Sequence, residues 1–121
     1  MNIEKVNIKN KLEKFSDYWN PRIIGELNGQ HVKLVKARGE FVWHKHDHED
    51  EMFFVVEGNL KIEFRDHTAT LGPNEFIIIP KGVEHRPVAE KEVSIMLFEP
   101  AGTLNTGDTN GKYTRRNLEE I

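Results

Sequence analysis

From Arg22 to Glu99 the chain is a succession of short β-rich segments separated by turn residues, and this pattern restricts the fold more than any other feature. Asn28-Gly29 is the strongest hairpin signal, because both residues tolerate the backbone conformation that a two-residue hairpin turn requires. About eight short strands without helices between them predict a β-sandwich or a small β-barrel. The expected strands are RIIGEL, HVKLVKA, EFVWHKH, EMFFVVE, NLKIEF, TATL, EFIIIP and VSIMLFE.

The two ends of the chain differ from this central region. Apolar residues recur at helical spacing before Asn20-Pro21, where the residue preceding proline disfavours helix, so a short N-terminal helix is expected. These residues are Ile8, Leu12, Phe15 and Trp19. After Pro100 the sequence becomes polar and aperiodic. We therefore expect an N-terminal segment (1–21) packed on a β-barrel (22–100), and a C-terminal tail (101–121) that packs over the barrel or across a dimer.

The composition limits the chemistry and the partners. There is no cysteine, which leaves histidine and carboxylate side chains as the strong metal ligands. The 17 lysines and arginines are scattered and the net charge is −3, so nucleic acid is not an expected partner. The N-terminus lacks an apolar core segment, and no apolar run reaches the roughly 18 residues of a membrane span. We expect no membrane association and a cytoplasmic location.

A block of polar and ionisable side chains, HKHDHEDE at residues 44–51, lies between two apolar runs. Alternate side chains of an extended strand share a face, so His44 and His46 point the same way. After a turn, Glu51 can return to that side. Further along, PKGVEH offers His85 after a bend at Gly82. If that bend brings His85 to the first hairpin, three imidazoles and a carboxylate form a ligand set suited to manganese, iron, cobalt, nickel, copper or zinc.

The spacing His44-x-His46-x4-Glu51-x6-Gly58, followed by Pro80-x-Gly82-x2-His85, resembles the two motifs of the cupin superfamily of small jelly-roll β-barrels. The resemblance covers residues 39–87. It implies an all-β fold, a single jelly-roll barrel with a short N-terminal helix and an irregular C-terminal tail. By motif position it also implies that a divalent transition metal ion is bound by His44, His46, Glu51 and His85.

Three positions depart from the family pattern. Four residues rather than five separate Gly39 from His44, Asn74 stands where the second motif usually opens with glycine, and Ala89 replaces a frequent asparagine. Asparagine also tolerates the left-handed conformation, so the change at position 74 is mild. An alternative register would use His46 and His48, which leaves only two residues before Glu51 and cramps the turn.

A metal ion with four protein ligands in a six-coordinate arrangement keeps about two positions for water or substrate. We therefore expect a metal-dependent enzyme acting on a small polar molecule, as an isomerase, an epimerase or a dioxygenase. The alternative is a small-molecule or metal-binding module without catalysis, because no nucleophile or acid–base pair stands out beyond the ligands. The segments MFFVV and FIII are apolar on both faces, which predicts a covering partner and thus a homodimer.

Overall fold

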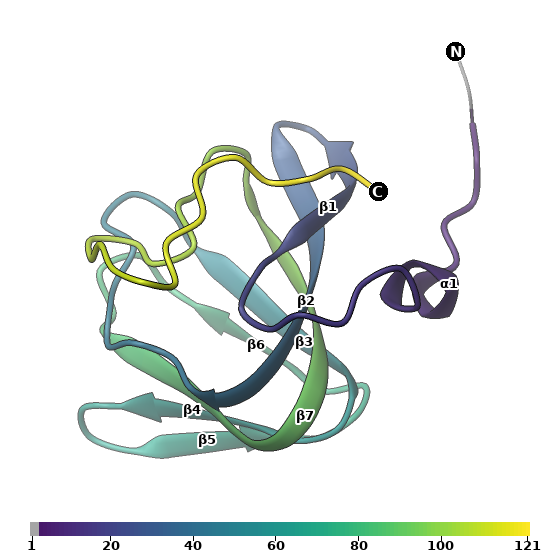
Figure 1. Cartoon of the computed structure of the whole chain (residues 1–121). Helices are drawn as coiled ribbons and strands as arrows, with labels where there is room; N and C mark the ends of the chain where they lie inside the picture. Colours follow the sequence, from purple (N-terminus) through teal and green to yellow (C-terminus); the bar gives the residue numbers. More distant parts are fainter. Residues whose placement is uncertain (1–2) are drawn as a thin grey trace.

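Seven strands and one short helix follow one another along residues 3–121, the part of the chain that the computed structural model describes (Figure 1). The elements are α1 (Ile8–Leu12), β1 (Arg22–Leu27), β2 (Gln30–Glu40), β3 (Glu51–Glu57), β4 (Leu60–Phe64), β5 (Thr68–Leu71), β6 (Phe76–Ile79) and β7 (His85–Pro100). Every strand pairing is antiparallel. The all-β jelly-roll barrel predicted from the sequence is confirmed.

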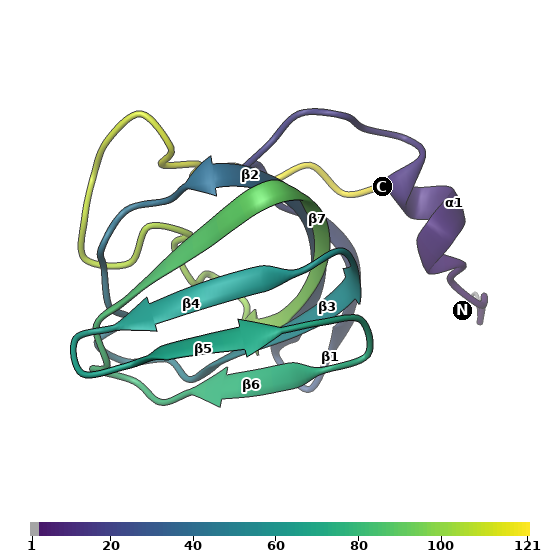
Figure 2. The same cartoon turned by 90° about the horizontal axis from the view of Figure 1, so that it is seen from below.

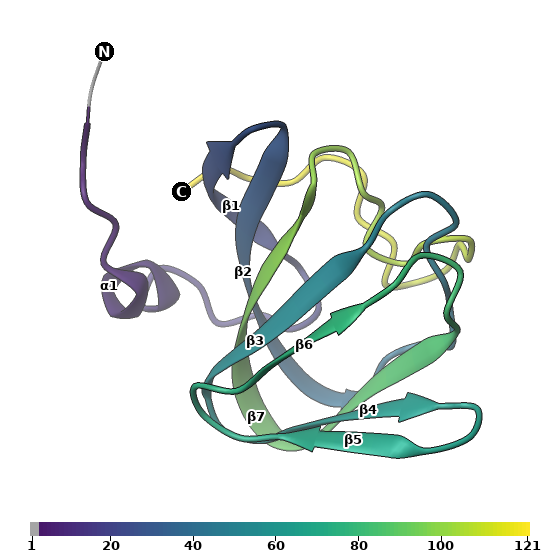
Figure 3. The same cartoon turned by 180° about the vertical axis from the view of Figure 1, so that it is seen from behind.

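The long strand β7 joins the two layers of the barrel. Hydrogen-bonded neighbours follow the order β1-β2-β7-β3-β6, while β4 pairs with β7 and β5 pairs with β4. The first residues of β7, 85–88, pair with β4, and residues 94–98 pair with β3. Figures 2 and 3 show β7 curving between the layer that holds β4 and β5 and the layer that holds β1 and β2. Side chains on its inner side therefore face both layers.

The turns follow the chemistry of their residues. Asn28 and Gly29 have φ values of 50° and 75°, as a two-residue hairpin turn of mirror-image type requires, and they connect β1 to β2 in the expected register. Asn74 also adopts a left-handed conformation, with φ of 67°. Asparagine thus takes the backbone geometry for which cupins usually have glycine at this position, as expected.

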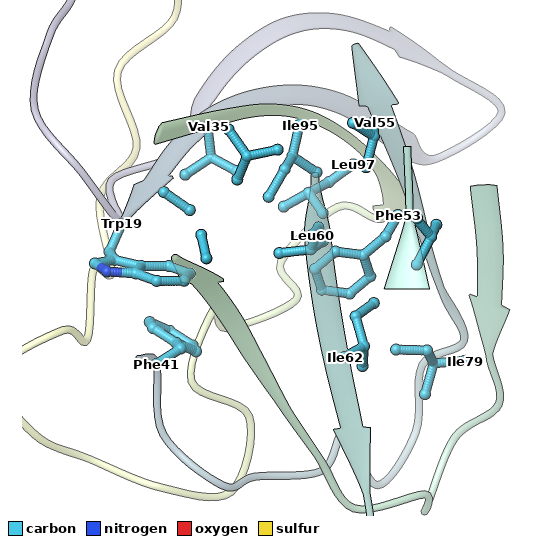
Figure 4. Close-up of a cluster of buried hydrophobic side chains, with 14 residues drawn as sticks. Trp19, Val35, Phe41, Phe53, Val55, Leu60, Ile62, Ile79, Ile95 and Leu97 are labelled. Atoms are coloured by element: carbon cyan, nitrogen blue, oxygen red, sulfur yellow. The ribbon is translucent and has the colours of Figure 1, made fainter. Parts of the chain in front are cut away.

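Alternate residues of the strands build one apolar core inside the barrel. Leu60 and Ile62 of β4 are fully buried while Lys61 is exposed, so the alternation predicted for this strand is confirmed. Val55 of β3 and Ile95 of β7 lie opposite one another in register and face inward as well. Figure 4 shows this cluster, with Trp19 and Phe41 on one side and Phe53 on the other.

The N-terminal helix is shorter than the spacing of apolar residues predicted. It ends at Leu12, and Trp19 has a φ of 59°, which excludes it from a right-handed helix. Tertiary contacts explain this conformation: the indole N–H of Trp19 donates to the carbonyl of Arg38 at 3.0 Å, and its ring stacks on Phe41. Leu12 and Phe15 instead pack on Leu34, on the outside of β2.

The C-terminal residues run over one end of the barrel rather than away from it (Figure 1). Tyr113 stacks on Phe41 with ring centroids 5.4 Å apart, and the backbone of Ile121 pairs with Ile23 of β1. Of the two expected placements of the tail, packing over the barrel is observed. Within residues 3–121, no helix has both the length and the apolar character needed to cross a membrane.

Candidate metal centre

Four side chains from distant parts of the sequence converge inside the barrel: His44, His46, Glu51 and His85. One possible ligand atom from each lies within 4.8 Å of every other, and all four residues are buried. Metal–ligand bonds of about 2.0–2.2 Å place two donors of one ion at most about 4.4 Å apart, so the cluster is close to the size that one ion requires. The convergence expected from the sequence is present in the structure.

Backbone hydrogen bonds hold the two histidine-bearing segments together. His44 and His85 exchange a reciprocal pair, with N···O distances of 3.1 and 2.9 Å. The N–H of Gly82 donates to the carbonyl of His46 at 2.8 Å, so the bend after Pro80 is fastened to the first motif as well. The relative position of the three imidazoles is therefore set by main-chain contacts.

Two local expectations about these segments are wrong. EFVWHKH is not a strand: residues 41–46 are irregular apart from the bridge between His44 and His85, and Phe41 faces the core with His44 and His46. The last strand is longer than predicted: His85 follows the bend at Gly82, as expected, but it also opens β7, which begins eight residues before the predicted segment VSIMLFE. Pairing of residues 85–88 with β4, a contact between remote residues, extends the strand.

The hydrogen bonds of His44 and His85 leave a free lone pair on each ring. The Nδ1 atoms lie 2.9 Å from the carbonyl oxygens of Val42 and Val83, respectively, which assigns the proton to Nδ1. Nε2 is then the unprotonated atom that a metal ion would bind. Backbone carbonyls commonly orient metal-binding imidazoles in this way.

Three buried polar atoms at the centre of the cluster have no hydrogen-bond partner within residues 3–121: Nε2 of His46, Nε2 of His85 and Oε1 of Glu51. Glu51 Oε1 lies 3.3 Å from His46 Nε2 and 3.5 Å from His85 Nε2, but neither contact has hydrogen-bond geometry. A buried polar atom without a partner costs about 1–3 kcal/mol. The donor set and its unmet bonding capacity fit a divalent cation.

Burial and neighbouring groups shift the pKa values of the site residues in different directions. Burial, reinforced by the neighbouring His85, lowers the pKa of His44 to about 4, so this ring is neutral at pH 7. Burial also opposes charge on His46, but the interaction with the Glu51 carboxylate outweighs burial and raises the pKa of His46. Interactions with Glu99, His46 and His85 likewise overcome burial and hold the pKa of Glu51 well below its usual range. A carboxylate is thus available to a cation.

Comparison with known proteins agrees with this geometry. The sequence model for the Cupin domain matches residues 30–99, which include all four side chains of the cluster. The chain belongs to the cupin family.

Relatives of this cupin cover most of its length. A cupin-2 domain protein from Shewanella frigidimarina is 50% identical, with a TM-score of 0.78 over 78% of this chain and 93% of that one. Protein NMB1881 from Neisseria meningitidis is 36% identical, with a TM-score of 0.75 over 81% of this chain and 100% of that one. The curated protein YdbB from Bacillus subtilis is 47% identical over 64 residues, 52% of this chain, and the match spans 57% of YdbB.

A buried ion pair that was not predicted from the sequence lies next to Glu51. Lys33 Nζ is 2.8 Å from Glu99 Oε1, and both residues are only 1% exposed. Glu99 also interacts with the carboxyl group of Glu51; burial and that neighbour raise the pKa of Glu99 well above its usual range. The alternation of side chains along β2 could have indicated that Lys33 is buried, because Lys33 lies on the same side of the strand as Val35, which faces inward. Lys33 and Glu99 thus support one side of the Glu51 carboxyl group in this cupin.

The alternative register of the first motif does not match the structure. His48 is exposed and outside the cluster. Trp43 also lies apart from the cluster, with the guanidinium of Arg65 3.8 Å above its ring.

Metal affinity of this cupin is expected to fall while the pH is still above 6.5. In the metal-free protein His46 binds a proton up to a higher pH than an ordinary histidine, and the metal must displace that proton. Lower pH favours the proton, so affinity decreases as pH falls through the raised pKa of His46. Calorimetry in two buffers of different ionisation enthalpy, at pH 7.5 and 6.5, measures affinity and protons released. Equal affinities and no proton release at both pH values would contradict this expectation.

The C-terminal tail closes over the His44 side of the centre. Asp108 N–H donates to the carbonyl of Lys45, and Asp108 Oδ1 accepts from Lys45 N–H, each at 3.0 Å. Gly107, with φ of 56°, approaches so closely that a Cβ there would overlap the carbonyl oxygen of Lys45 and lie 3.1 Å from the His44 ring. This close approach requires glycine.

Substituting Gly107 by alanine should therefore displace the tail from the metal centre. We expect a loss of about 1–3 kcal/mol in the free energy of unfolding, typical of forced overpacking, together with weaker metal binding. Chemical denaturation and metal titration measure the two effects. Gly111→Ala is the matched control, because a Cβ at Gly111 would have no atom of the described part of the chain within 4 Å. Equal effects of the two substitutions would show that the tail does not depend on the contact at Gly107.

Proposed function

We propose that this cupin binds one divalent transition metal ion through His44, His46, Glu51 and His85 and that it is a metal-dependent enzyme acting on a small molecule. The observation that carries the proposal is the convergence of buried donor atoms without partners at the centre of the cluster. A bound ion would polarise a carbonyl for isomerisation or epimerisation, or would activate dioxygen. Three imidazoles and a carboxylate suit manganese, iron, cobalt, nickel, copper or zinc.

The protein's own residues would orient the donors and exclude water. The carbonyls of Val42 and Val83 fix two of the rings, and the Lys33–Glu99 pair supports Glu51. A cavity borders His44 and Glu51, so one side of the donor set is left open by the protein. An open side favours an enzyme over a closed structural site. A binding module without catalysis is the second candidate.

Two measurements test this function. Elemental analysis of protein produced without a chelating tag should find about one transition metal ion per chain, in line with a single donor set. Manganese-loaded protein should then accelerate the relaxation of water protons, because an open position exchanges bound water with solvent. Absence of metal binding would overturn the metal site. A bound ion without exchangeable water would instead support the module.

The outside of β3, β6 and β7 supports a homodimer. Cross-strand pairs join Phe54 to Phe76 and to Met96, and Met52 to Ile78 and to Phe98. We call these six residues the outer apolar face. Phe76 and Ile78 are each 58% exposed, while α1 and the segment after it cover Leu34 on the neighbouring strand. No member of the face is charged, so a second copy, with the same surface, can pair with it by two-fold symmetry without unpaired charges.

Sedimentation velocity at micromolar concentration tests the homodimer. We expect the wild-type protein to sediment as a dimer and Ile78→Lys to sediment as a monomer, because the substitution buries a charge in an apolar interface. Thr68→Lys, on exposed β5, is the matched control and should leave the dimer intact. A monomeric wild type, or equal behaviour of the two variants, would contradict pairing through the outer apolar face. The cytoplasmic location and the division of the chain at residues 21 and 100 stay predictions.

A further inference from the structure

We propose that the molecule held at this centre is small, and that its part beyond the metal-binding group is uncharged, apolar and about two heavy atoms in size. The inference rests on the proposed metal site and narrows its substrate class. It departs from the small polar molecule expected from the sequence. The lining and size of the cavity beside His44 and Glu51 carry the argument.

The walls of the cavity are almost entirely apolar. Apart from His44, Glu51 and Asn105, its lining consists of aromatic, aliphatic and proline residues. Those that form most of the wall are Trp19, Val35, Phe41, Phe53, Ile95 and Leu97. Trp19 and Phe41 stack with ring centroids 4.7 Å apart, and Figure 4 shows them facing the aliphatic side chains of β2 and β7. Such walls gain from contact with methyl and methylene groups.

The polar side-chain groups of the lining, other than the metal donors, are already hydrogen-bonded. The Asn105 amide donates to the carbonyl of Tyr113 at 2.8 Å and accepts from the N–H of Arg115 at 2.9 Å. The indole N–H of Trp19 donates to Arg38. A hydroxyl or charged group of a ligand would therefore lose water without a side-chain replacement, which disfavours sugars, amino acids and phosphates.

The size of the cavity limits the ligand further. The space open to the centres of water molecules is about 30 Å³. Since one water needs roughly 10–15 Å³ on this measure, the cavity takes about two waters or two carbon atoms. Among the described residues that line the cavity, Glu51 is the one carboxylate and none is a lysine or an arginine. A short alkyl group fits both the volume and the walls.

Hydroxamic acids that share one metal-binding group test this inference. Cobalt-loaded protein, its metal content measured first, is titrated with propionohydroxamate and with 2-hydroxyacetohydroxamate, and the absorption of the cobalt ion reports binding. The two probes differ by a methyl group in place of a hydroxyl. We expect propionohydroxamate to bind at least tenfold more tightly, and benzohydroxamate, whose ring exceeds the cavity, to bind more weakly than propionohydroxamate. Cobalt held by nitrilotriacetate provides the reference for intrinsic metal affinity.

A variant of the cavity wall distinguishes contacts between the probe and the wall from binding of the probe to the metal ion. Val35→Thr places a hydroxyl on the wall at nearly constant volume, and it should reduce the preference for propionohydroxamate at least threefold with the cobalt content unchanged. Equal affinities of the first two probes, tighter binding of the hydroxylated probe, or no binding of any probe to cobalt-loaded protein would overturn the inference and leave the metal site standing. A protein that takes up no cobalt would instead overturn the proposed function, and this inference with it.

Discussion

Replacing His85 by alanine is expected to abolish metal binding. His85 is 0% exposed, and its unpartnered Nε2 faces Glu51 and the other two rings. Removing it leaves three donors and a void at the centre. Loss of residues that merely support metal ligands lowers affinity roughly 10–100-fold, so loss of a ligand should exceed that range. Elemental analysis after equilibrium dialysis should find metal in the wild-type protein and close to none in the variant.

The control for this experiment is His67→Ala. His67 is exposed on the turn between β4 and β5, where its ring lies beside Asp66, and it is not a member of the cluster. Its loss should leave metal content unchanged. Circular dichroism of both variants checks that the barrel is folded. Full metal occupancy in folded His85→Ala protein would remove His85 from the ligand set and with it the proposed centre.

The second large effect concerns the buried ion pair. Lys33→Met leaves the Glu99 carboxyl group inside the barrel next to Glu51 without its cation. Because the pKa of Glu99 is raised, this group can take up a proton in place of the lysine, and we expect a loss at the lower end of about 3–5 kcal/mol in the free energy of unfolding. The double variant Lys33→Met/Glu99→Leu removes both charges at similar volume and should recover most of that loss. Urea denaturation of the metal-free proteins measures both.

The surface pair Lys61–Glu90 is the matched control for the buried pair. Its N···O distance is 2.6 Å, shorter than the 2.8 Å of Lys33–Glu99, yet both side chains are exposed to water. Because water solvates either partner after the other is removed, Lys61→Met should change stability little. If Lys33→Met were equally mild, or if the double variant were no more stable than the single one, burial of the charge would not be the cause.

Much of this fold was predictable because its determinants are local. Turn residues such as Asn28-Gly29 require particular backbone angles, and alternation in β4 marks its buried face. The four donors could be identified from the sequence because their spacing in two short motifs can be recognised without knowing the fold. Their geometry was predicted less well, because residues 41–46, expected to lie in a strand, are irregular apart from the bridge at His44.

What the sequence did not reveal depends on contacts between remote residues. The first half of β7 is a strand because it pairs with β4, and α1 stops early because Trp19 is held by Arg38 and Phe41. Lys33 and Glu99 resemble ordinary exposed charges of half-buried strands until both are placed beside Glu51. The small volume of the cavity depends on packing of whole side chains, which no pattern of residue types encodes.

The reciprocal main-chain bonds between His44 and His85 have a consequence for the order of events in the cell. Bringing the donors together costs chain entropy, and this cost accompanies the folding of the barrel itself. An ion that arrives later therefore binds to donors that are already in place rather than to a flexible loop. Zinc fingers behave oppositely, since they become ordered only when the ion arrives. The cupin should thus emerge from synthesis fully formed and remain able to exchange one ion for another, with its occupant decided by whichever cation is plentiful at the time.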